Sequence, residues 1–165
     1  MLVLVSNPRL DDQLCFALYA ASRAVIAAQR PGLRELGLTY PQYLVMLVLW
    51  EEREAPIGRL CARLHLDSGT VSPLVRRLEK AELVVRRRSD TDERSTIVAL
   101  TDAGADMADR ADCVTAALGD SIVAAEEADP DGVPQFGVAD VGALREALHN
   151  LIGELDRIES PQPRS

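Results

Sequence analysis

Two short amphipathic patterns in the middle of the chain restrict its fold more than any other feature. In both, apolar residues recur at spacings of three, four and seven, as they do along the buried side of a helix. The first pattern begins after Pro56, and the second follows Asp67-Ser68-Gly69, which is typical of a turn and helix N-cap. The apolar positions are Ile57, Leu60, Cys61 and Leu64, then Val71, Leu74, Val75 and Leu78. Two such helices joined by a short turn predict a helix-turn-helix.

Two β-rich runs follow the second helix directly. Residues 83–88 and 95–100 are rich in aliphatic side chains, and the polar segment 89–94 between them suits the tip of a hairpin. A helix-turn-helix followed by a hairpin is a winged helix. We therefore expect a mainly α-helical fold with a small β-hairpin, in which the winged helix-turn-helix covers about residues 53–100.

A separate helix is predicted just before this segment. Thr39 and Gln42 have the spacing of a capping box, and Pro41 suits a first helical turn. The apolar run 43–50 that follows has no polar face, so it is expected in a core or an interface. A buried strand is the alternative for this run, and the capping box favours the helix.

Helical patterns flank the winged helix on both sides. Residues 8–30 carry one apolar stripe and end at a break or turn at Pro31-Gly32. Residues 102–160 carry a long helix capped by Thr101, a loop at 129–134 and a last helix. In that last helix, apolar residues alternate at spacings of three and four: Val141, Leu144, Leu148, Leu151, Leu155 and Ile158. This helix-packing seam predicts pairing with a second copy, and the flanking helices of residues 8–30 and 102–160 are expected to be the dimerisation helices of a single domain of residues 1–165.

Composition limits the class of protein. The 165 residues suit one domain, and no apolar run approaches the roughly 18 residues of a membrane span. The three cysteines are an odd number, which does not suit a secreted disulfide framework and favours a reducing compartment. We therefore expect a cytoplasmic protein that does not contact a membrane.

The distribution of charge points to the middle of the chain as a binding surface. The net charge is −8, yet residues 53–94 contain ten basic and seven acidic residues, whereas residues 102–159 contain three and fourteen. Screening removes most repulsion beyond about 8–10 Å, so a local cationic face can still bind a polyanion. Double-stranded DNA is the partner that a winged helix with such a face would bind.

The second helix of the helix-turn-helix offers donors opposite its apolar stripe. Short hydroxyl side chains near its start suit phosphates and base edges, and the later cations suit guanine edges or phosphates. A merely solvated basic face is the alternative. The predicted DNA-binding residues on this helix are Ser68, Thr70, Ser72, Arg76, Arg77 and Lys80.

The hairpin adds a second group of cations. Arg86, Arg87 and Arg88 lie on its first strand, and Arg94 lies near its tip, where an arginine can enter a narrow minor groove. Asp92 is expected to orient Arg94 by a charge-assisted hydrogen bond. A calcium loop at the tip is disfavoured because the required glycine and a third acidic ligand are missing.

Enzymatic and metal functions have little support. The sequence lacks a phosphate-binding glycine-rich loop and the GxSxG, HExxH and CxxC motifs. A thiol peroxidase using Cys15 would need a thioredoxin-like alternation of strands and helices, which is absent. Cys61 and His65 have the spacing of half a zinc site, without a second pair. We expect neither an enzyme nor a bound cofactor or metal, and we expect Cys61 in the core.

Specific motifs resemble the MarR family of winged-helix regulators. They are LTYPQYLVML (38–47), LDSGT (66–70) and the wing RRRSDTDERS (86–95). Within that family, LCFALY (14–19) resembles the organic-hydroperoxide-resistance repressors. The resemblance covers about residues 10–104. It implies a homodimer that represses a peroxide-detoxification gene from a pseudo-palindromic operator, and that releases DNA when an organic hydroperoxide oxidises the N-terminal cysteine.

The resemblance also implies roles around Cys15. An unperturbed thiol has a pKa of about 8.5, so a sensor needs neighbours that lower it. Tyr40 matches a phenol that contacts the reactive cysteine in the family, and Tyr19 lies one turn from Cys15. Gln29 stands where the family usually has a second tyrosine, and Cys113 lies on the helix where some members carry a resolving cysteine.

Alternatives to these redox roles are open at this point. Cys15 is otherwise a small buried hydrophobe, and Cys113 an inert interface residue. The regulator would then release DNA on binding a small phenolic or other apolar ligand.

Overall fold

The computed structural model describes residues 9–89, 95–128 and 138–159. By contacts, the chain divides into two compact units, Met1–Ile122 and Val123–Ser165, which are described separately. The helices are α1 (Leu14–Ala28), α2 (Arg30–Glu35), α3 (Tyr40–Glu52), α4 (Ile57–Leu64), α5 (Ser68–Lys80), α6 (Asp102–Asp106), α7 (Asp112–Ala128) and α8 (Val138–Glu159). The strands are β1 (Glu54–Pro56), β2 (Val84–Arg88) and β3 (Thr96–Leu100), and short 3-10 helices lie at Leu10–Asp12 and Met107–Arg110.

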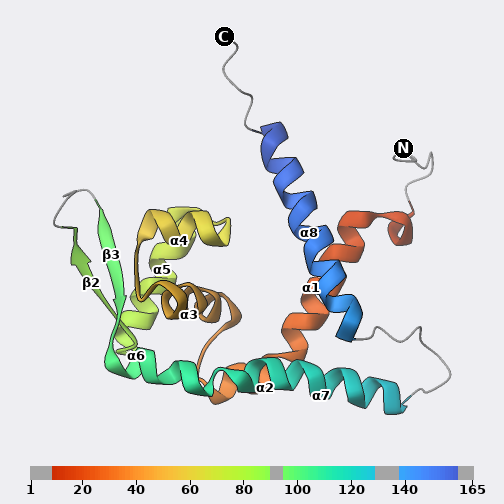
Figure 1. Cartoon of the computed structure of the whole chain (residues 1–165), viewed down its shortest axis with the longest axis horizontal. Coiled ribbons are helices and arrows are strands. Elements are labelled where there is room, and N and C mark those ends of the chain that lie inside the picture. Colours follow the sequence, from red (N-terminus) through yellow and green to blue (C-terminus); the bar gives the residue numbers. More distant parts are fainter. Residues whose placement is uncertain (1–8, 90–94, 129–137, 160–165) are drawn as a thin grey trace, which may run out of the picture. The chain divides into compact units, whose positions relative to one another are not determined.

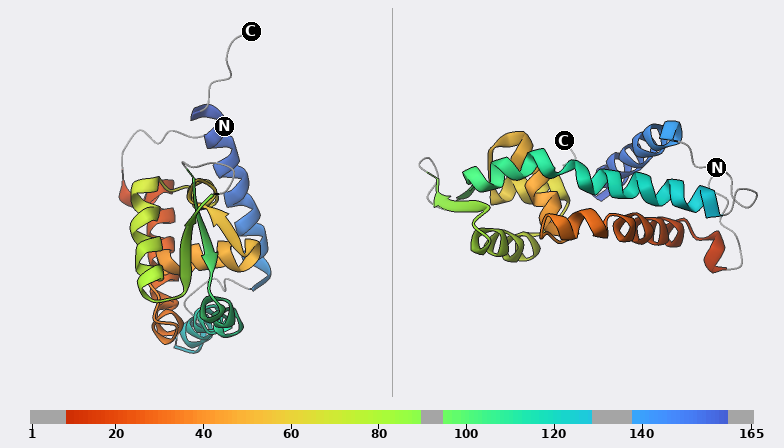
Figure 2. Two further views of the ribbon diagram at one scale, coloured as in Figure 1. Left: turned by 90° about the vertical axis from the view of Figure 1, so that its left-hand side faces the viewer. Right: turned by 90° about the horizontal axis from the view of Figure 1, so that it is seen from below.

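The winged helix predicted from the sequence is confirmed. α4 and α5 form the helix-turn-helix, and the hairpin of β2 and β3 extends beside them (Figure 1 and Figure 2). The apolar run after Thr39 is helix α3, because the Thr39 backbone N–H donates to Gln42 Oε1 at 2.9 Å and completes the predicted capping box.

The sheet has a third strand that the sequence analysis missed. Its order is β1-β3-β2, and both pairings are antiparallel. Val98 at the centre of β3 is opposite Ala55 on one side and Arg86 on the other. β1 ends in proline, which is tolerated on an edge strand. Because β1 is only three residues long, its sequence has no alternating pattern that could be detected.

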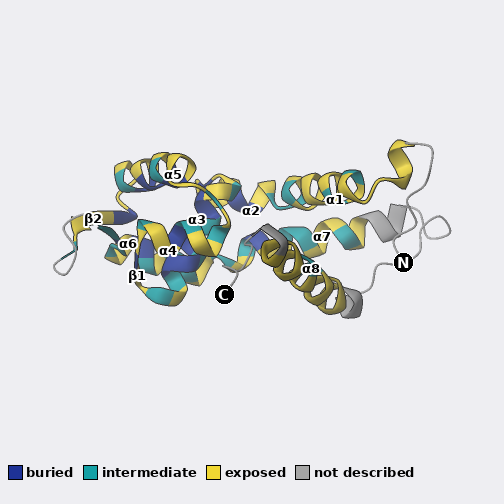
Figure 3. Cartoon of the chain, turned by 90° about the horizontal axis from the view of Figure 1, so that it is seen from above, coloured by how far each residue is buried: buried dark blue, intermediate teal, exposed yellow. Residues whose placement is uncertain are grey.

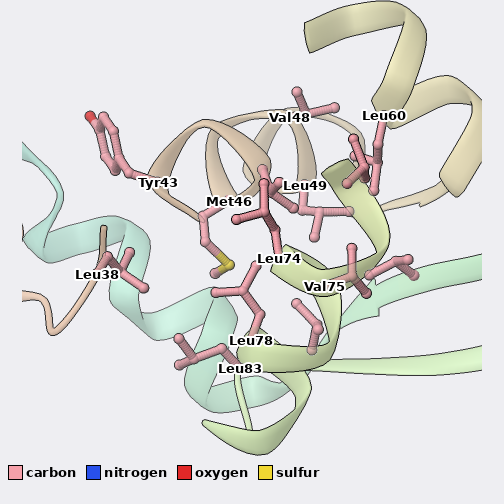
Figure 4. Packing of buried hydrophobic residues seen from close by; sticks show 14 of the residues in the cluster. Leu38, Tyr43, Met46, Val48, Leu49, Leu60, Leu74, Val75, Leu78 and Leu83 are labelled. Carbon is pink, nitrogen blue, oxygen red and sulfur yellow. The ribbon is translucent and has the colours of Figure 1, made fainter. Parts of the chain in front are cut away.

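The core lies where α3, α4 and α5 meet the base of the sheet (Figure 4). Met46, Leu49, Leu60 and Leu78 are fully buried there, and Val98 joins them from β3. Burying one such aliphatic side chain contributes about 1.5–3 kcal/mol. α3, the helix-turn-helix and the sheet therefore share one mainly aliphatic core within a single chain, which suits a sequence with only 4% aromatic residues.

The predicted long helix after Thr101 is interrupted, which corrects the sequence interpretation. The cap is confirmed, since the Gly104 N–H donates to Thr101 Oγ1 at 3.0 Å. α6 then gives way to the 3-10 helix before α7 begins. Gly104 explains the tight docking of α6, because a Cβ atom there would lie 2.0 Å from the Leu83 carbonyl oxygen. Its own carbonyl accepts the Trp50 indole N–H at 2.8 Å, which ties α6 to α3.

The predicted break in the first helix is confirmed, since α1 ends at Ala28, but Pro31-Gly32 lies at the start of a helix rather than in a turn. Pro31 lies in the first turn of α2, where its missing N–H leaves no helical hydrogen bond unmade. Gly32 is buried against α7, and a Cβ atom there would lie 2.4 Å from the Cys113 carbonyl oxygen. α2 and the first part of α7 therefore pack backbone to backbone.

α1 and α8 differ from the helices of the winged helix in burial (Figure 3). No residue of α1 is buried, although all of α1 is described, and its predicted buried stripe includes the exposed Leu14 and Val25. In the other unit, the α8 seam residues Val141, Leu144 and Leu155 are exposed. None of the helices in the described ranges combines the length and the hydrophobicity that a membrane span requires.

Candidate DNA interface and redox site

The N-terminus of α5 is fixed by Asp67. Its Oδ1 atom accepts the Thr70 backbone N–H at 2.8 Å, and its Oδ2 atom accepts the Thr70 hydroxyl at 3.0 Å. These hydrogen bonds from Thr70 hold the pKa of Asp67 below its ordinary value. The helix therefore begins at a charged N-cap, and Thr70, a predicted DNA ligand, already donates its hydroxyl within the chain.

The predicted DNA-binding residues of α5 all lie away from the core. Val71, Leu74, Val75 and Leu78 are buried, which turns the opposite side of the helix outward. We call this side the outer face of α5. Five of its residues are exposed and Ser72 is half-buried: Ser68, Thr70, Ser72, Arg76, Arg77 and Lys80.

The arginines of β2 are not equivalent. Arg86 Nε donates to Glu79 Oε2 at 2.8 Å, and Arg87 Nη2 donates to Glu54 Oε1 at 2.8 Å. The Arg86 guanidinium lowers the pKa of Glu79. Arg88 is exposed and has no ion-pair partner among the residues that the structure describes. Asp92 and Arg94, predicted at the hairpin tip, lie outside the described residues.

Two carboxylates at the end of α3, Glu51 and Glu52, bind the arginines of α4. Arg59 forms an ion pair with Glu52 at 3.1 Å, and Arg63 contacts both Glu52 and Glu51. The hydrogen bond from Arg59 is the main cause of the lowered pKa of Glu52, and the hydrogen bond to Glu51 is the main cause of the raised pKa of Arg63. These four charges neutralise one another on the protein itself.

Ion pairs with carboxylates therefore divide the cations of the winged helix into paired and unpaired groups. Among the described residues of α5 and β2, four cations have no ion pair. They are Arg76, Arg77, Lys80 and Arg88. Free guanidinium and ammonium groups on a helix and an adjacent strand are suited to contact phosphates and base edges.

Cys15 lies exposed in the first turn of α1. Tyr19, one turn away, accepts a hydrogen bond from Arg23 Nη1 at 2.8 Å, and the guanidinium carbon lies 5.5 Å from the ring centre. Tyr40 lies at the start of α3, half-buried against the core. Within the described residues of one chain, Cys15 makes no hydrogen bond to Tyr19, Tyr40 or Gln29.

Gln29, at the end of α1, has an unsatisfied polar atom. Its Oε1 atom is buried and has no hydrogen-bond partner among the described residues. A buried acceptor without a donor is costly, so this atom is a position where a further donor would be stabilising. The Gln29 side-chain oxygen is thus available for a contact.

Cys113 occupies a different environment from Cys15. It is half-buried, and its Sγ atom lies 3.5 Å from the Gly32 carbonyl oxygen, to which the thiol can donate. Burial raises its pKa, and the Glu35 carboxylate acts in the same direction. At neutral pH this sulfur is therefore a protonated thiol, which is a poor nucleophile.

Tyr43 is a buried tyrosine of α3 that the sequence pattern did not single out. Its ring is buried beside Trp50, with ring centres 5.9 Å apart in an edge-to-face arrangement. Burial raises its pKa, and the charges of Cys113 and Tyr40 raise it further. Tyr43 lies inside the apolar run 43–50, where the sequence signal indicates core rather than a site.

Comparison with known proteins identifies relatives across most of the chain. The family described as "Transcriptional regulator SarA/Rot" matches residues 28–111, about half of the sequence. The organic hydroperoxide resistance transcriptional regulator of Bacillus subtilis is 44% identical over 103 residues, which are 62% of this chain and 70% of the relative.

Two further matches agree with this one. The HTH-type transcriptional regulator TtmR of Methylorubrum extorquens is 48% identical over 110 residues, which are 67% of this chain and 56% of that relative. The structure of reduced AbfR, a Staphylococcus epidermidis protein, bound to DNA has a TM-score of 0.70 and 30% identity, covering 92% of this chain and 96% of AbfR. The chain therefore belongs to the MarR family of winged-helix transcriptional regulators, in the subgroup of the organic-hydroperoxide-resistance repressors.

Proposed function

We propose that the protein is a dimeric transcriptional repressor that binds a pseudo-palindromic operator and releases it when an organic hydroperoxide oxidises Cys15. The observation that carries this proposal is the arrangement of free cations. The outer face of α5 and the end of β2 hold unpaired basic groups, although the chain has a net charge of −8. The relative AbfR, which was solved on DNA in its reduced form, supports the same mode of binding.

DNA binding follows from the geometry of the winged helix. α5 would enter the major groove with Arg76, Arg77 and Lys80, and the wing would lie along the flanking minor groove. Arg94 at the wing tip stays a prediction, as does its orientation by Asp92. Each phosphate contact by Lys or Arg releases counterions, so affinity should fall steeply with salt.

The exposed apolar side chains support a homodimer. Leu10, Leu14 and Val25 are exposed on and before α1, and three seam residues of α8, Val141, Leu144 and Leu155, are exposed in the other unit. Water-exposed leucines and valines on amphipathic helices are stabilised when a second copy covers them. A two-fold dimer would present two α5 helices to successive major grooves, which matches a pseudo-palindromic site.

Oxidation of Cys15 is the proposed trigger. The Cys15 thiolate attacks one peroxide oxygen, the O–O bond breaks, and the alkoxide takes a proton and leaves as an alcohol. The product is a sulfenic acid, which is larger and more polar than the thiol. On a helix that packs in the dimer, this change would disturb packing and shift the two α5 helices from their DNA-binding positions.

Division of roles between the cysteines is part of the proposal. Cys113 is proposed for a second, slower step, in which its sulfur loses the thiol proton, attacks the Cys15 sulfenic acid of the partner subunit and releases water. The Tyr40 hydroxyl and the Gln29 amide N–H are proposed to donate hydrogen bonds near the Cys15 sulfur once the dimer forms. The unsatisfied Gln29 oxygen is an acceptor and needs a donor that one chain does not supply.

Two further features belong to the proposal. We expect the protein to act by binding rather than by catalytic turnover, because its sequence motifs are those of a DNA-binding fold. We expect it in the cytoplasm, where its DNA and a reducing environment are found.

Titration of an operator complex with an organic hydroperoxide tests this function. Wild type should release DNA, Cys15→Ser should stay bound, and Cys113→Ser should release DNA without forming a cross-linked dimer on a non-reducing gel. Release by Cys15→Ser would contradict the role of Cys15. If wild type ignores peroxide and releases DNA with a phenolic compound, control by a ligand would replace control by oxidation.

A matched pair of variants tests the DNA interface. Arg76→Gln removes a free cation of the outer face, and Arg59→Gln removes a cation already paired with Glu52. Arg76→Gln should weaken binding and reduce the salt dependence by about one contact per protomer, whereas Arg59→Gln should change little. Equal effects of the two variants would contradict the proposed interface.

A further inference from the structure

Glu79 lies near the end of α5 and binds an arginine of the wing. Arg86 places both Nε and Nη2 on the same carboxylate oxygen, at 2.8 and 2.6 Å. The side chains are 35% and 34% exposed, so the pair is open to solvent and to any polyanion that approaches α5. The ion pair therefore lies within the surface that would meet DNA, rather than in the core.

Arg86 and Arg88 form a comparison within one strand. Alternate residues of a strand share a face, so both arginines lie on the same side of β2. Arg88 has no ion pair among the described residues, whereas Arg86 is held by Glu79. Arg76 and Lys80, close to Glu79 along α5, are also free. Glu79 is thus an acidic group that neutralises one cation beside three that remain available.

A carboxylate and a phosphate make the same kind of contact with an arginine. Both accept the planar N–H groups of the guanidinium in short, charge-assisted hydrogen bonds. The N–H groups that Arg86 gives to Glu79 are not available to a phosphate at the same time. An arginine neutralised within the protein also contributes little to the release of counterions from DNA.

We propose that Glu79 is a positioning residue that competes with DNA phosphate for Arg86 and thereby limits the affinity and salt dependence of DNA binding. The inference rests on the proposed DNA-binding function. It assigns to Glu79 a moderating role that a simple count of basic residues would miss. A merely structural ion pair would affect thermal stability and leave the salt dependence of DNA binding unchanged.

The experiment compares Glu79→Gln with a matched control, Glu82→Gln. Glu82 lies at the turn after α5, is exposed, and has no arginine partner among the described residues. Binding to a mixed-sequence duplex of about three helical turns is measured by fluorescence anisotropy between about 50 and 200 mM salt. Freeing Arg86 should steepen the slope of log K against log salt by about 0.9 per protomer, or nearly two per dimer.

When salt is raised from about 50 to about 200 mM, the DNA affinity of Glu79→Gln should fall by a factor about ten times larger than that of wild type. Glu82→Gln should leave the slope near the wild-type value. The Glu79→Gln effect should disappear in a chain that also carries Arg86→Gln, because no arginine is then released. Thermal melts of each variant report on folding separately.

Three results would overturn the inference. One is an unchanged or shallower slope in Glu79→Gln, another is an equal change in Glu82→Gln, and the third is persistence of the effect beside Arg86→Gln. Failure of the proposed function has a different signature, since wild type itself would then show no salt-dependent binding to duplex DNA.

Discussion

The winged helix and the flanking helices solve the burial of apolar side chains in different ways. α3, α4, α5 and the sheet enclose Met46, Leu49 and Leu60 entirely with residues of one chain. α1 and α8 carry equally regular apolar patterns, yet Leu14 is 60% exposed and Leu155 is 52% exposed. The same helical periodicity thus has two meanings. In the middle of the chain, the apolar side of each helix is buried within one chain. At the ends, it is left to be covered by a second copy.

This difference assigns folding to one set of helices and the response to oxidation to another. A core completed within one chain holds α5 and its cations in place relative to the rest of that core, even when the distance between two copies changes. Helices whose apolar faces depend on a second copy respond to a small chemical change, because their packing rests on complementarity between two surfaces. Cys15 lies on such a helix, whereas Cys113 packs against Gly32 beside the winged helix.

The largest effect is expected from the core. Leu49→Ala removes a fully buried side chain of α3 and should lower the free energy of unfolding by about 2–5 kcal/mol. Urea denaturation followed by far-ultraviolet circular dichroism measures this loss. A change below about 1 kcal/mol would show that the winged-helix core is not completed by its own residues.

Next in size is a change in the α8 seam. Leu144→Glu places a charge at an exposed seam position and should cost the dimer about 1.5–3 kcal/mol, which is roughly a 10–150-fold increase in its dissociation constant. Analytical ultracentrifugation measures this constant. Glu146→Gln, on the opposite side of α8, is the control and should leave the dimer intact. Unchanged dimerisation in Leu144→Glu would remove the seam from the interface.

A smaller effect is expected where α6 meets the sheet. A Cβ atom at Gly104 would lie 2.0 Å from the Leu83 carbonyl oxygen, so Gly104→Ala must displace α6 from the base of the wing. We expect a loss of about 1–3 kcal/mol in thermal or urea unfolding. Gly119→Ala is a suitable control, because a Cβ atom there would have no neighbour within 4 Å. Equal stability of the two variants would contradict the close packing of α6.

The smallest effect is expected in the pH dependence of alkylation, which distinguishes the two cysteines. Burial raises the pKa of Cys113, so its alkylation by iodoacetamide should stay slow at neutral pH and speed up only above the ordinary range of a thiol. Mass spectrometry of wild type and Cys15→Ser assigns each rate, and denaturation in urea should make the rates equal. Rapid alkylation of folded Cys113 at neutral pH would contradict its packing on Gly32.

Much of the fold was predictable because local signals agreed with the tertiary structure. The capping box at Thr39, the stripes of α4 and α5 and the cap at Thr101 are satisfied by neighbouring residues, so the sequence contains the whole pattern. β1 and the break after α6 were missed, because each depends on a contact distant in sequence. Ala55 pairs with Val98, and Gly104 packs against Leu83.

The candidate site shows the same difference between local signals and contacts that are distant in sequence. The outer face of α5 follows from helical periodicity, and the structure leaves its cations exposed. The pairing of Arg86 with Glu79 and of Arg87 with Glu54 has no periodic signal, because the partners lie on different elements. The surroundings of Cys15 are the least complete, since one chain leaves α1 uncovered. The roles of Tyr40, Tyr19 and Gln29, and the single domain of residues 1–165, stay predictions.

Hydrogen exchange before and after oxidation tests the central claim most directly. When reduced protein is treated with an organic hydroperoxide, amides of α1 and α8 should lose protection, while those of α3, α4 and α5 keep it and DNA is released. Cys15→Ser should show neither change. Loss of protection spread through α3, α4 and α5 would contradict the claim, because oxidation would then act by unfolding the winged helix rather than by loosening the contact between two copies.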